Sequence, residues 1–243
     1  MQTHPNLKGQ WALITGASAG IGRACALTLA RAGVNIYLTG RKEVELKAVQ
    51  SECQSHGVQA PYMSGDLGDR SFVKELVEWS SSAQILINNA GTLTYAPVLE
   101  VTTDECEHMF AINVVAAYDV SRAIAEQMKK RGSGHLIFIT SLAARNVNVH
   151  SVVYAATKHA LSALAKGFRL ELKKDLIKVT EIAPGMVDTE MRSAITHPEV
   201  LKAIASRTFK PIAAQDVANA ALYALSSSEG CCPDLIELRP IVG

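Results

Sequence analysis

Short apolar segments alternate with longer helical ones along this chain, and this order constrains its fold more than any other feature. Runs such as QWALITG and QILINNAG are almost continuously apolar, whereas the segments between them repeat apolar residues at helical spacing. Continuous apolar strands separated by helices are typical of a parallel sheet that is covered on both faces. The order therefore predicts a doubly wound α/β fold with about seven parallel strands.

The 243 residues, of which 48% are hydrophobic, suffice for the core of one large domain. No linker rich in Pro or Ser, low-complexity tract or internal repeat divides the sequence. We therefore expect residues 1–243 to form a single domain. An irregular segment at about residues 187–211 contains two prolines and the weakly helical stretch EVLKAIASR, so we expect it to be a lid-like insertion.

The formal net charge of +1, with 19% charged residues, offers no field that would attract nucleic acid or an anionic membrane. The five cysteines form no Cys-x-x-Cys unit and no spaced set of Cys and His ligands, which predicts neither a metal site nor a disulfide framework. The stretch MQTHPNLKGQ lacks a signal-peptide pattern, and no apolar run reaches the ~18 residues of a membrane span. We expect a cytoplasmic protein that binds neither membranes nor nucleic acid.

A glycine-rich turn follows the first predicted strand and opens the first predicted helix. In ITGASAGIGRA the glycines are Gly16, Gly20 and Gly22. Glycines at such a turn let the backbone approach a pyrophosphate closely, and the amides at the helix N-terminus favour its negative charge. This position predicts a dinucleotide site. The spacing differs from Gly-x-Gly-x-x-Gly, however, and an ordinary glycine-rich turn is the alternative.

The end of the second predicted strand, YLTGRK, bears on which cofactor is bound. Arg41 and Lys42 would suit a ribose 2′-phosphate, which an arginine can bind through two hydrogen bonds, and Gly40 leaves space there. These residues favour NADP over NAD. The alternative is that they are a solvated helix start, with Glu43 or Glu45 available to bind a free 2′-hydroxyl instead.

Further motifs follow in a characteristic order. They are Asp66 after the third strand, NNAG (Asn88–Gly91), Asn113 in INVVAAY, Ser141 in ITSLAAR, Tyr154 and Lys158 in YAATK, and PGMVDT ending at Thr189. Together with TGASAGIG, this ordered set resembles the classical short-chain dehydrogenase/reductase family over nearly the whole chain. The resemblance implies a Rossmann fold and a nicotinamide-dependent enzyme.

The resemblance implies four catalytic residues, Asn113, Ser141, Tyr154 and Lys158. Tyr154 is implied to exchange a proton with the substrate oxygen, and positive charge on Lys158 and on the oxidised nicotinamide is expected to lower its pKa from about 10. Ser141, rather than its neighbour Thr140, is implied to donate a hydrogen bond to that oxygen. The structural alternatives are a core or interface aromatic for Tyr154 and a turn-forming serine for Ser141.

Asn113 interrupts an apolar helical segment, where an amide needs partners. The resemblance implies a local helix distortion with a water that links Lys158 to solvent, and a buried asparagine bridging helices is the alternative. Asp66 is implied to contact the adenine, although it could instead cap a helix. The implied cofactor-binding residues are Gly16, Ser18, Gly20, Ile21, Gly22, Arg41, Asp66, Asn88, Ala90, Gly91, Tyr154, Lys158, Pro184, Gly185, Val187 and Thr189.

The expected function is hydride transfer between NADP(H) and a carbonyl or secondary alcohol of a small substrate. The ending IELRP weakly resembles enzymes acting on hydroxy acids, and a simple alcohol is also open. A 3-oxoacyl-thioester reductase and a non-catalytic dinucleotide-sensing regulator are the alternatives. Arg145 or Arg192 could bind a substrate carboxylate, and His150 could contact the substrate. The resemblance also implies a homo-oligomer, a tetramer or a dimer.

Overall fold

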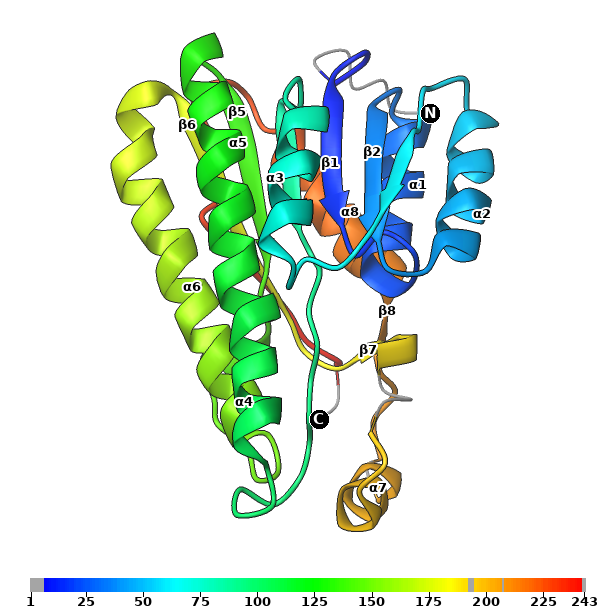
Figure 1. Cartoon of the computed structure of the whole chain (residues 1–243), viewed down its shortest axis with the longest axis vertical. Coiled ribbons are helices and arrows are strands. Elements are labelled where there is room, and N and C mark those ends of the chain that lie inside the picture. The colour runs from blue at the N-terminus through cyan, green and yellow to red at the C-terminus, as the bar shows by residue number, and fades with distance from the viewer. Residues whose placement is uncertain (1–6, 192–194, 207, 242–243) are drawn as a thin grey trace.

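The computed structural model of the chain describes residues 7–191, 195–206 and 208–241, and a parallel sheet of seven strands forms its centre (Figure 1). The strand order is β3-β2-β1-β4-β5-β6-β9, and every pairing within it is parallel. The predicted doubly wound α/β fold is therefore confirmed. In that order the strands are Tyr62–Ser64, Asn35–Gly40, Trp11–Thr15, Ile85–Asn88, Gly134–Ile139, Ile177–Pro184 and Leu235–Leu238.

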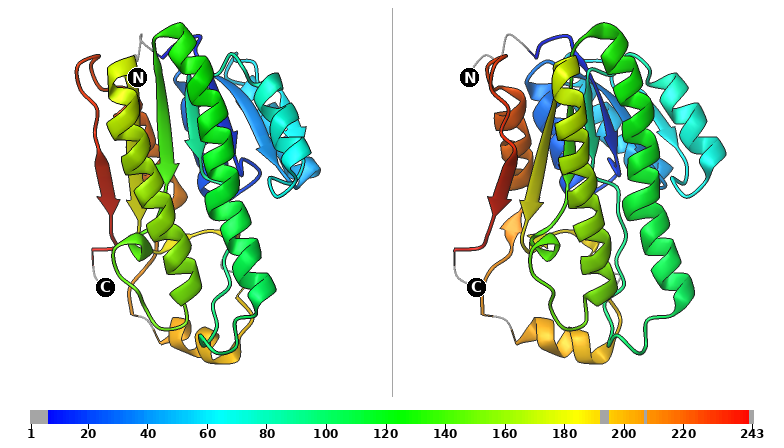
Figure 2. Two further views of the ribbon diagram at one scale, coloured as in Figure 1. Left: turned by 60° about the vertical axis from the view of Figure 1, so that its left-hand side comes forward. Right: turned by 90° about the vertical axis from the view of Figure 1, so that its left-hand side faces the viewer.

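Helices cover both faces of the sheet, which explains why its strands are continuously apolar (Figure 2). Successive side chains of a strand point to opposite faces. Ile14 of β1 and Ile87 of β4 accordingly belong to one core, whereas the preceding residues of these strands belong to the other. The first face carries α1 (Gly20–Arg31), α2 (Glu43–Gln54) and α8 (Ala214–Leu225), and the second carries α3 (Arg70–Trp79), α5 (Ala117–Arg131) and α6 (Val152–Leu172).

The strand order reverses at β1, which pairs with β2 on one side and with β4 on the other. The chain leaves β1 for α1 on one face, while the connections beyond β4 lead to α5 on the opposite face. Open α/β sheets bind ligands at this switch point, at the carboxyl ends of the strands. The fold thus brings the glycine-rich turn after β1 beside the NNAG segment after β4.

The helix before α5 is irregular. It begins as α4 (Thr103–Phe110), where Thr102 accepts a hydrogen bond from the Glu105 amide at 3.2 Å and caps the first turn. It continues through a π-helical segment, η1 (Ala111–Ala116), before α5 resumes the α-helical pattern. A π-helical turn inside an α-helix frequently marks a functional site because it redirects the side chains it contains.

The segment expected to be an insertion, at about residues 187–211, begins with one strand of a short two-stranded sheet. The second strand of that sheet directly follows the segment. Its β7 (Val187–Asp188) pairs in parallel with β8 (Ile212–Ala213), and between them lies α7 (Pro198–Ala205), which includes most of the weakly helical stretch. Among the described residues, two contacts between a histidine and a carboxylate connect α7 and the residue before it to the rest of the molecule. His197 Nε2 lies 3.1 Å from Glu100, and Glu199 lies 3.2 Å from His150 Nε2.

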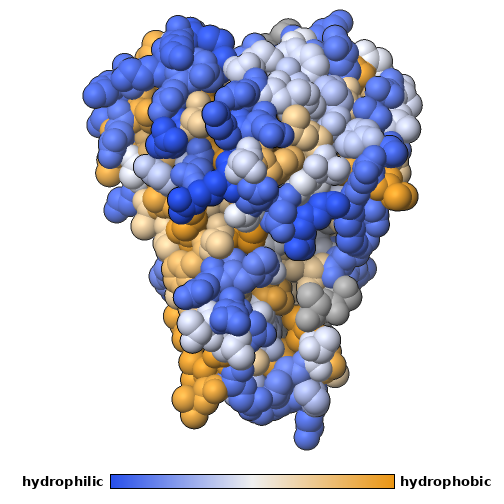
Figure 3. Space-filling view, viewed as in Figure 1, coloured by the Kyte–Doolittle hydropathy of each residue, from blue (hydrophilic) through white to orange (hydrophobic). Residues whose placement is uncertain are grey.

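The surface is unevenly apolar (Figure 3). Apolar side chains gather at the lower end of the molecule in that view, the end that holds α4 and α7 in Figure 1. The loop before α4 contributes Val98 and Leu99, whose exposed fractions are 53% and 95%. None of the helices in the described ranges combines the length and the apolar character that a bilayer span requires.

Candidate active site

A cavity of about 1010 Å³ opens at the carboxyl ends of the strands. It extends from the turn after β1, past the ends of β4 and β5, to the start of α6 and the insertion. Most of the residues expected from the sequence line it. They are Gly16, Ser18, Gly20, Ile21, Arg41, Asp66, Ala90, Gly91, Ser141, Tyr154, Lys158, Pro184, Gly185, Val187 and Thr189.

The turn after β1 leaves no room for side chains at two of its glycines. Gly16 has φ +66°, and a Cβ there would lie 2.9 Å from Asn89 Nδ2. Gly22 does not line the cavity, but a Cβ on it would lie 2.2 Å from the Gly16 carbonyl oxygen. Only glycine permits this packing of α1 against the turn, so the first amides of α1 are held at the cavity wall.

Two residues that the sequence did not single out hold this turn against the segment after β4. Asn89 Nδ2 donates to the carbonyl oxygens of Thr15 and Gly16, at 2.9 and 3.2 Å. The Thr15 hydroxyl accepts from the amides of Asn89 and Ala90, both at 3.0 Å. Thr15 of TGASAGIG and Asn89 of NNAG thus hold the two motifs together by hydrogen bonds. The two residues are far apart in the sequence, so the sequence alone does not show this contact.

The carboxyl end of β2 presents a cation to the cavity. Arg41 lines it and makes no ion pair with any residue that the structure describes. Lys42 is held by Glu190 at 3.0 Å. Of the two acids considered as hydroxyl ligands, Glu43 pairs with Lys47 at 2.9 Å, and Glu45 lies 3.9 Å from Lys42. Arg41 is therefore the available charged group at this end of the cavity.

The structure shows how two residues of the expected adenosine site are placed, Asp66 and Asn88, of which the second was expected to act through its backbone. Asp66 is not a helix cap: its Oδ1 accepts from the Gly68 amide at 2.8 Å, and Asp69 caps α3 instead. Asn88 does not line the cavity, because its side chain is buried and donates to Ser121 Oγ of α5 at 2.7 Å. Side chains alternate along β4, so the Asn88 side chain points to α5, and it is Asn89 that reaches the cavity wall.

Tyr154 lies in the first turn of α6 and is buried, with 8% of its surface exposed. Its ring packs edge-to-face on Tyr95, with 5.5 Å between ring centroids, and its hydroxyl lies near the Ser141 side chain. Burial raises the pKa of Tyr154, the proximity of Tyr95 raises it further, and only the Ser141 side chain lowers it. The expected lowering of this pKa is therefore wrong for the protein alone, since burial disfavours the phenolate more than Ser141 favours it.

Lys158 follows Tyr154 by one turn of α6. Its Nζ lies 5.8 Å from the centroid of the Tyr154 ring and donates to the carbonyl oxygen of Ile139, at the end of β5, at 3.1 Å. The side chain is buried, and burial lowers the pKa of Lys158 to about 8. The ammonium is thus still the main form at neutral pH, and it is held by the backbone of the strand that leads to Ser141.

Asn113 lies in η1 and is fully buried. Its Oδ1 accepts from the Thr92 amide at 2.7 Å, and its Nδ2 donates to the Thr92 carbonyl oxygen at 2.8 Å and to Thr157 Oγ1 at 3.0 Å. The structure agrees with parts of both interpretations of Asn113, the helix distortion and the bridge between helices. The helix is distorted around Asn113, and its side-chain amide bridges to α6. It does not line the cavity itself, but a Cβ on Gly91 would lie 3.2 Å from its Oδ1.

Three residues are candidates for contact with the substrate, namely Arg145, His150 and Arg192, and the structure describes the first two of them. Arg145 does not line the cavity, because its guanidinium donates to Glu181 and Ser162 instead, each at 2.8 Å. The suggestion that it binds a substrate carboxylate is therefore wrong. His150 lines the cavity and pairs with Glu199 of α7. Arg192 lies outside the described residues.

The part of the cavity beyond Tyr154 is mainly apolar. The insertion contributes apolar side chains from before, within and after α7, and the loop after β4 contributes an aromatic ring. Most of these residues lie in loop segments, which carry no periodic pattern in the sequence, and three of them lie in α7. They are Leu93, Tyr95, Met186, Met191, Ile195, Val200, Ala203, Ile204 and Phe209.

Among the described residues, no group of three or more His, Cys, Asp or Glu side chains is placed to hold a metal ion. The polar groups of the cavity include a phenol, a hydroxyl, a buried ammonium and a glycine-rich helix start.

Comparison with known proteins agrees with this arrangement. Residues 10–200 match the family model for short chain dehydrogenase. An uncharacterized oxidoreductase of Staphylococcus aureus (strain USA300) is 31% identical over 234 residues, 95% of this chain and 96% of that protein. The uncharacterized oxidoreductase YohF of Escherichia coli (strain K12) is 37% identical over 188 residues, 75% of this chain and 74% of that protein.

The fold is also shared with a solved structure. An alcohol dehydrogenase from the archaeon Thermococcus sibiricus, complexed with 5-hydroxy-NADP, superposes with a TM-score of 0.83 at 26% identity, covering 96% of this chain and 97% of that one. The family model spans the glycine-rich turn, Ser141, Tyr154, Lys158 and Thr189. This chain therefore belongs to the short chain dehydrogenase family and is an oxidoreductase of that type.

Proposed function

We propose that the protein transfers hydride between NADP(H) and a carbonyl or secondary alcohol of a small, neutral substrate. The observation that carries this proposal is the juxtaposition of Ser141, Tyr154 and Lys158 at one wall of a cavity whose other end is a glycine-lined helix start. A nicotinamide nucleotide, when bound, supplies or accepts the hydride. The chain itself contributes binding, orientation and the proton.

The glycine-rich turn fits a dinucleotide. A Cβ at Gly16 or Gly22 would fill the space against which the turn packs, and the amides that start α1 carry the partial positive charge that phosphates favour. Asp66, Ala90 and Gly91 would border the adenosine and its ribose, and Pro184 to Thr189 would border the nicotinamide.

NADP is the proposed cofactor. Arg41 has the geometry to bind a 2′-phosphate through two hydrogen bonds, and no described acid neutralises it. The structurally similar alcohol dehydrogenase complexed with 5-hydroxy-NADP supports the same choice. A carboxylate in the position of Arg41 would instead favour NAD.

Tyr154 would donate its phenolic proton to the substrate oxygen during carbonyl reduction and take one back during alcohol oxidation. Its raised pKa keeps the phenol protonated in the protein, which suits proton donation. Ser141 would donate a hydrogen bond to the same oxygen as negative charge develops on it. The Lys158 ammonium would stabilise the phenolate that remains, and in the reverse direction the positive nicotinamide would add to this effect.

The substrate end of the cavity supports a neutral substrate with an apolar group. Its walls are largely apolar side chains of the insertion, and Asn146, Asn148, His108 and His150 add hydrogen-bonding groups to the lining of the cavity. Arg145, one of the two arginines considered as ligands of a substrate carboxylate, donates to Glu181 instead, and Arg192 lies outside the described residues. A ketone or secondary alcohol thus fits these walls better than a hydroxy acid does.

A homo-oligomer is part of the proposal. Val115 and Tyr118, near the junction of η1 and α5, are exposed by 42% and 41%, and Val152 at the start of α6 is exposed by 40%. Apolar side chains on adjacent helices favour a covered surface. Sedimentation equilibrium with Tyr118→Lys as a comparison would test it, and a monomeric wild-type protein would contradict it.

The test of the activity is oxidation of NADPH and of NADH over neutral ketones, aldehydes, keto acids and 3-oxoacyl thioesters. We expect turnover of a neutral ketone or aldehyde with NADPH. Turnover confined to keto acids or thioesters would contradict the substrate class, and tight NADPH binding without turnover of any carbonyl would identify a sensor instead of an enzyme.

A further inference from the structure

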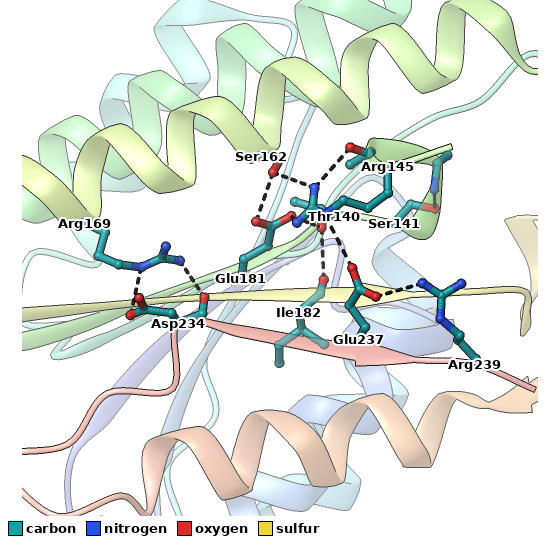
Figure 4. Close-up of polar contacts among 12 residues, drawn as sticks. Thr140, Ser141, Arg145, Ser162, Arg169, Glu181, Ile182, Asp234, Glu237 and Arg239 are labelled. Carbon is teal, nitrogen blue, oxygen red and sulfur yellow. Dashed lines mark hydrogen bonds and ion pairs between the residues drawn. The ribbon is translucent and has the colours of Figure 1, made fainter. Parts of the chain in front are cut away.

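The polar groups around the buried carboxylate of Glu181 form a hydrogen-bonded network next to the proposed catalytic residues. Glu181 lies near the carboxyl end of β6 and is only 4% exposed. Its Oε1 accepts from Thr140 Oγ1 at 2.7 Å and from Arg145 Nη2 at 2.8 Å, and its Oε2 accepts from Ser162 Oγ at 3.0 Å (Figure 4). A carboxylate this buried is costly unless such partners satisfy it.

Each of the three partners belongs to an element that carries a proposed catalytic residue. Thr140 directly precedes Ser141, and Arg145 ends the short helix η2 (Leu142–Ala144) that follows it. Ser162 lies on α6 one turn beyond Lys158. Arg145 also donates a hydrogen bond to Ser162 at 2.8 Å, so that Glu181, Arg145 and Ser162 are each hydrogen-bonded to the other two.

The segment of Ser141 is thus held at both ends by the same carboxylate. Within it, the Ala143 amide donates to Ser141 Oγ at 3.1 Å, which fixes the side chain relative to η2. The Lys158 Nζ contact with the carbonyl oxygen of Ile139 lies immediately before Thr140. Among the described residues, Glu181 is the only acidic residue that is buried.

The network continues to the edge strand β9. Arg145 Nε lies 3.4 Å from Glu237, whose other oxygen pairs with Arg239 at 2.8 Å (Figure 4). Arg145 therefore spans from the buried carboxylate to the sheet edge, with 27% of its side chain exposed. Its inner contacts with Glu181 and Ser162 connect the segment after Ser141 to β6 and to α6, the helix of Lys158.

We propose that Glu181 and Arg145 are positioning residues that set the distance between the Ser141 hydroxyl and the Tyr154 phenol by anchoring residues 140–145 to α6. This inference rests on the proposed function only for its effect on turnover. Hydrogen-bond geometry in a catalytic site is demanding, and a displacement of about 1 Å can cost roughly 100-fold in rate. An anchor made of charged, buried hydrogen bonds is rigid enough to prevent it.

The first test is a double-mutant cycle with Arg145→Met and Ser141→Ala, measured as kcat and KM for the best carbonyl substrate of the wild-type protein. If Arg145 acts by placing Ser141, its loss lowers kcat at least about ten-fold in the wild type but less than about two-fold in Ser141→Ala, because residues that act as a unit are not additive. Affinity for NADPH should change by less than about two-fold, since the nucleotide-binding residues are untouched. Arg145→Lys should recover part of kcat.

Arg169→Met is the matched control. Arg169 also joins α6 to β6 and β9, through the Val179 carbonyl oxygen at 3.0 Å and Asp234 at 3.2 Å, but at the far end of these strands (Figure 4). It should lower stability without lowering kcat. If Arg145→Met fails to fold, Ser162→Ala removes one bond to Glu181 with a smaller change, and the same pattern is expected at a lower amplitude.

Amide hydrogen exchange provides a readout without substrate. Residues 141–146 should exchange faster in Arg145→Met than in the wild type, and at the wild-type rate in Arg169→Met. Unchanged exchange in Arg145→Met, or equal losses of kcat in both Ser141 backgrounds, would overturn the anchor. Absence of turnover by the wild-type protein would instead contradict the proposed function, while the exchange result would still decide the anchor.

Discussion

The Lys158 ammonium lies 5.8 Å from the centre of the Tyr154 ring and is held by the carbonyl oxygen of Ile139 at 3.1 Å. The helix places the two residues one turn apart, and the strand fixes the ammonium. Burial affects them oppositely: it raises the pKa of the Tyr154 phenol and lowers that of Lys158 to about 8. The site therefore holds a protonated phenol beside an ammonium that begins to lose its proton just above neutral pH.

Replacement of Tyr154 by phenylalanine should lower kcat by about 100- to 10,000-fold, the usual contribution of a positioned acid or base. The ring, and with it the packing on Tyr95, is retained, so NADPH affinity and thermal stability should stay close to those of the wild type. Steady-state kinetics and calorimetry measure these quantities. Tyr223→Phe, at a side chain that is 66% exposed, is the control, and a Tyr154→Phe protein with normal kcat would disprove the assignment.

Arg41→Ala should weaken NADPH binding by about 10- to 100-fold, corresponding to the ~1.5–3 kcal/mol of a hydrogen bond to a charged group, and should leave NADH binding almost unchanged. Fluorescence titration with both nucleotides would measure this. Lys42→Ala is the comparison, because Lys42 is already paired with Glu190 and should matter less. Equal losses for NADPH and NADH would show that Arg41 does not read the 2′-phosphate.

Gly22→Ala should lower the free energy of unfolding by about 1–3 kcal/mol, the range for overpacking a filled space. The added Cβ would lie 2.2 Å from the Gly16 carbonyl oxygen and 2.6 Å from Asn89 Nδ2, so the phosphate turn must shift and nucleotide affinity should fall as well. Gly167→Ala is the control within α6, where a Cβ meets nothing within 4 Å. That variant should gain about 0.5–1 kcal/mol from helix propensity, and denaturant unfolding measures both.

Stability should fall in acid partly because of His135. Its Nε2 lies 2.8 Å from Thr180 Oγ1, whose own proton goes to the Pro233 carbonyl oxygen, so a neutral imidazole that donates from Nε2 fits the site. Burial, and secondly the charge of Lys178, lower the pKa of His135 from 6.5 to about 3. The unfolded chain then binds a proton that the folded protein resists, and stability is lost as the pH falls from about 6.5 towards 3, by up to about 1.4 kcal/mol per pH unit.

His135→Gln keeps a donor and removes the titration, so its free energy of unfolding should decline less steeply between pH 7 and pH 5 than that of the wild type. Urea unfolding at three pH values in this range compares the two slopes. Parallel curves would mean that His135 is charged in the folded protein or that other groups dominate the acid response.

Local sequence was sufficient for the parts of this protein that depend on neighbours along the chain. The apolar runs predicted the parallel sheet because burial on both faces demands them. The glycines of the first turn and the spacing of Tyr154 and Lys158 likewise follow from backbone sterics and from the helical repeat. Even the helix in the insertion was visible, as EVLKAIASR.

Tertiary structure decided what depends on partners distant in sequence. Arg145 looked available to a substrate until the fold placed Glu181, 36 residues further on, against its guanidinium. The side chain of Asn88 turns away from the cavity and donates to Ser121 of α5, a partner 33 residues further on. The upward shift of the Tyr154 pKa arises from burial under Tyr95 and the surrounding elements. Desolvation and hydrogen bonding depend on which groups surround an atom in space, and only the packed strands and helices determine that.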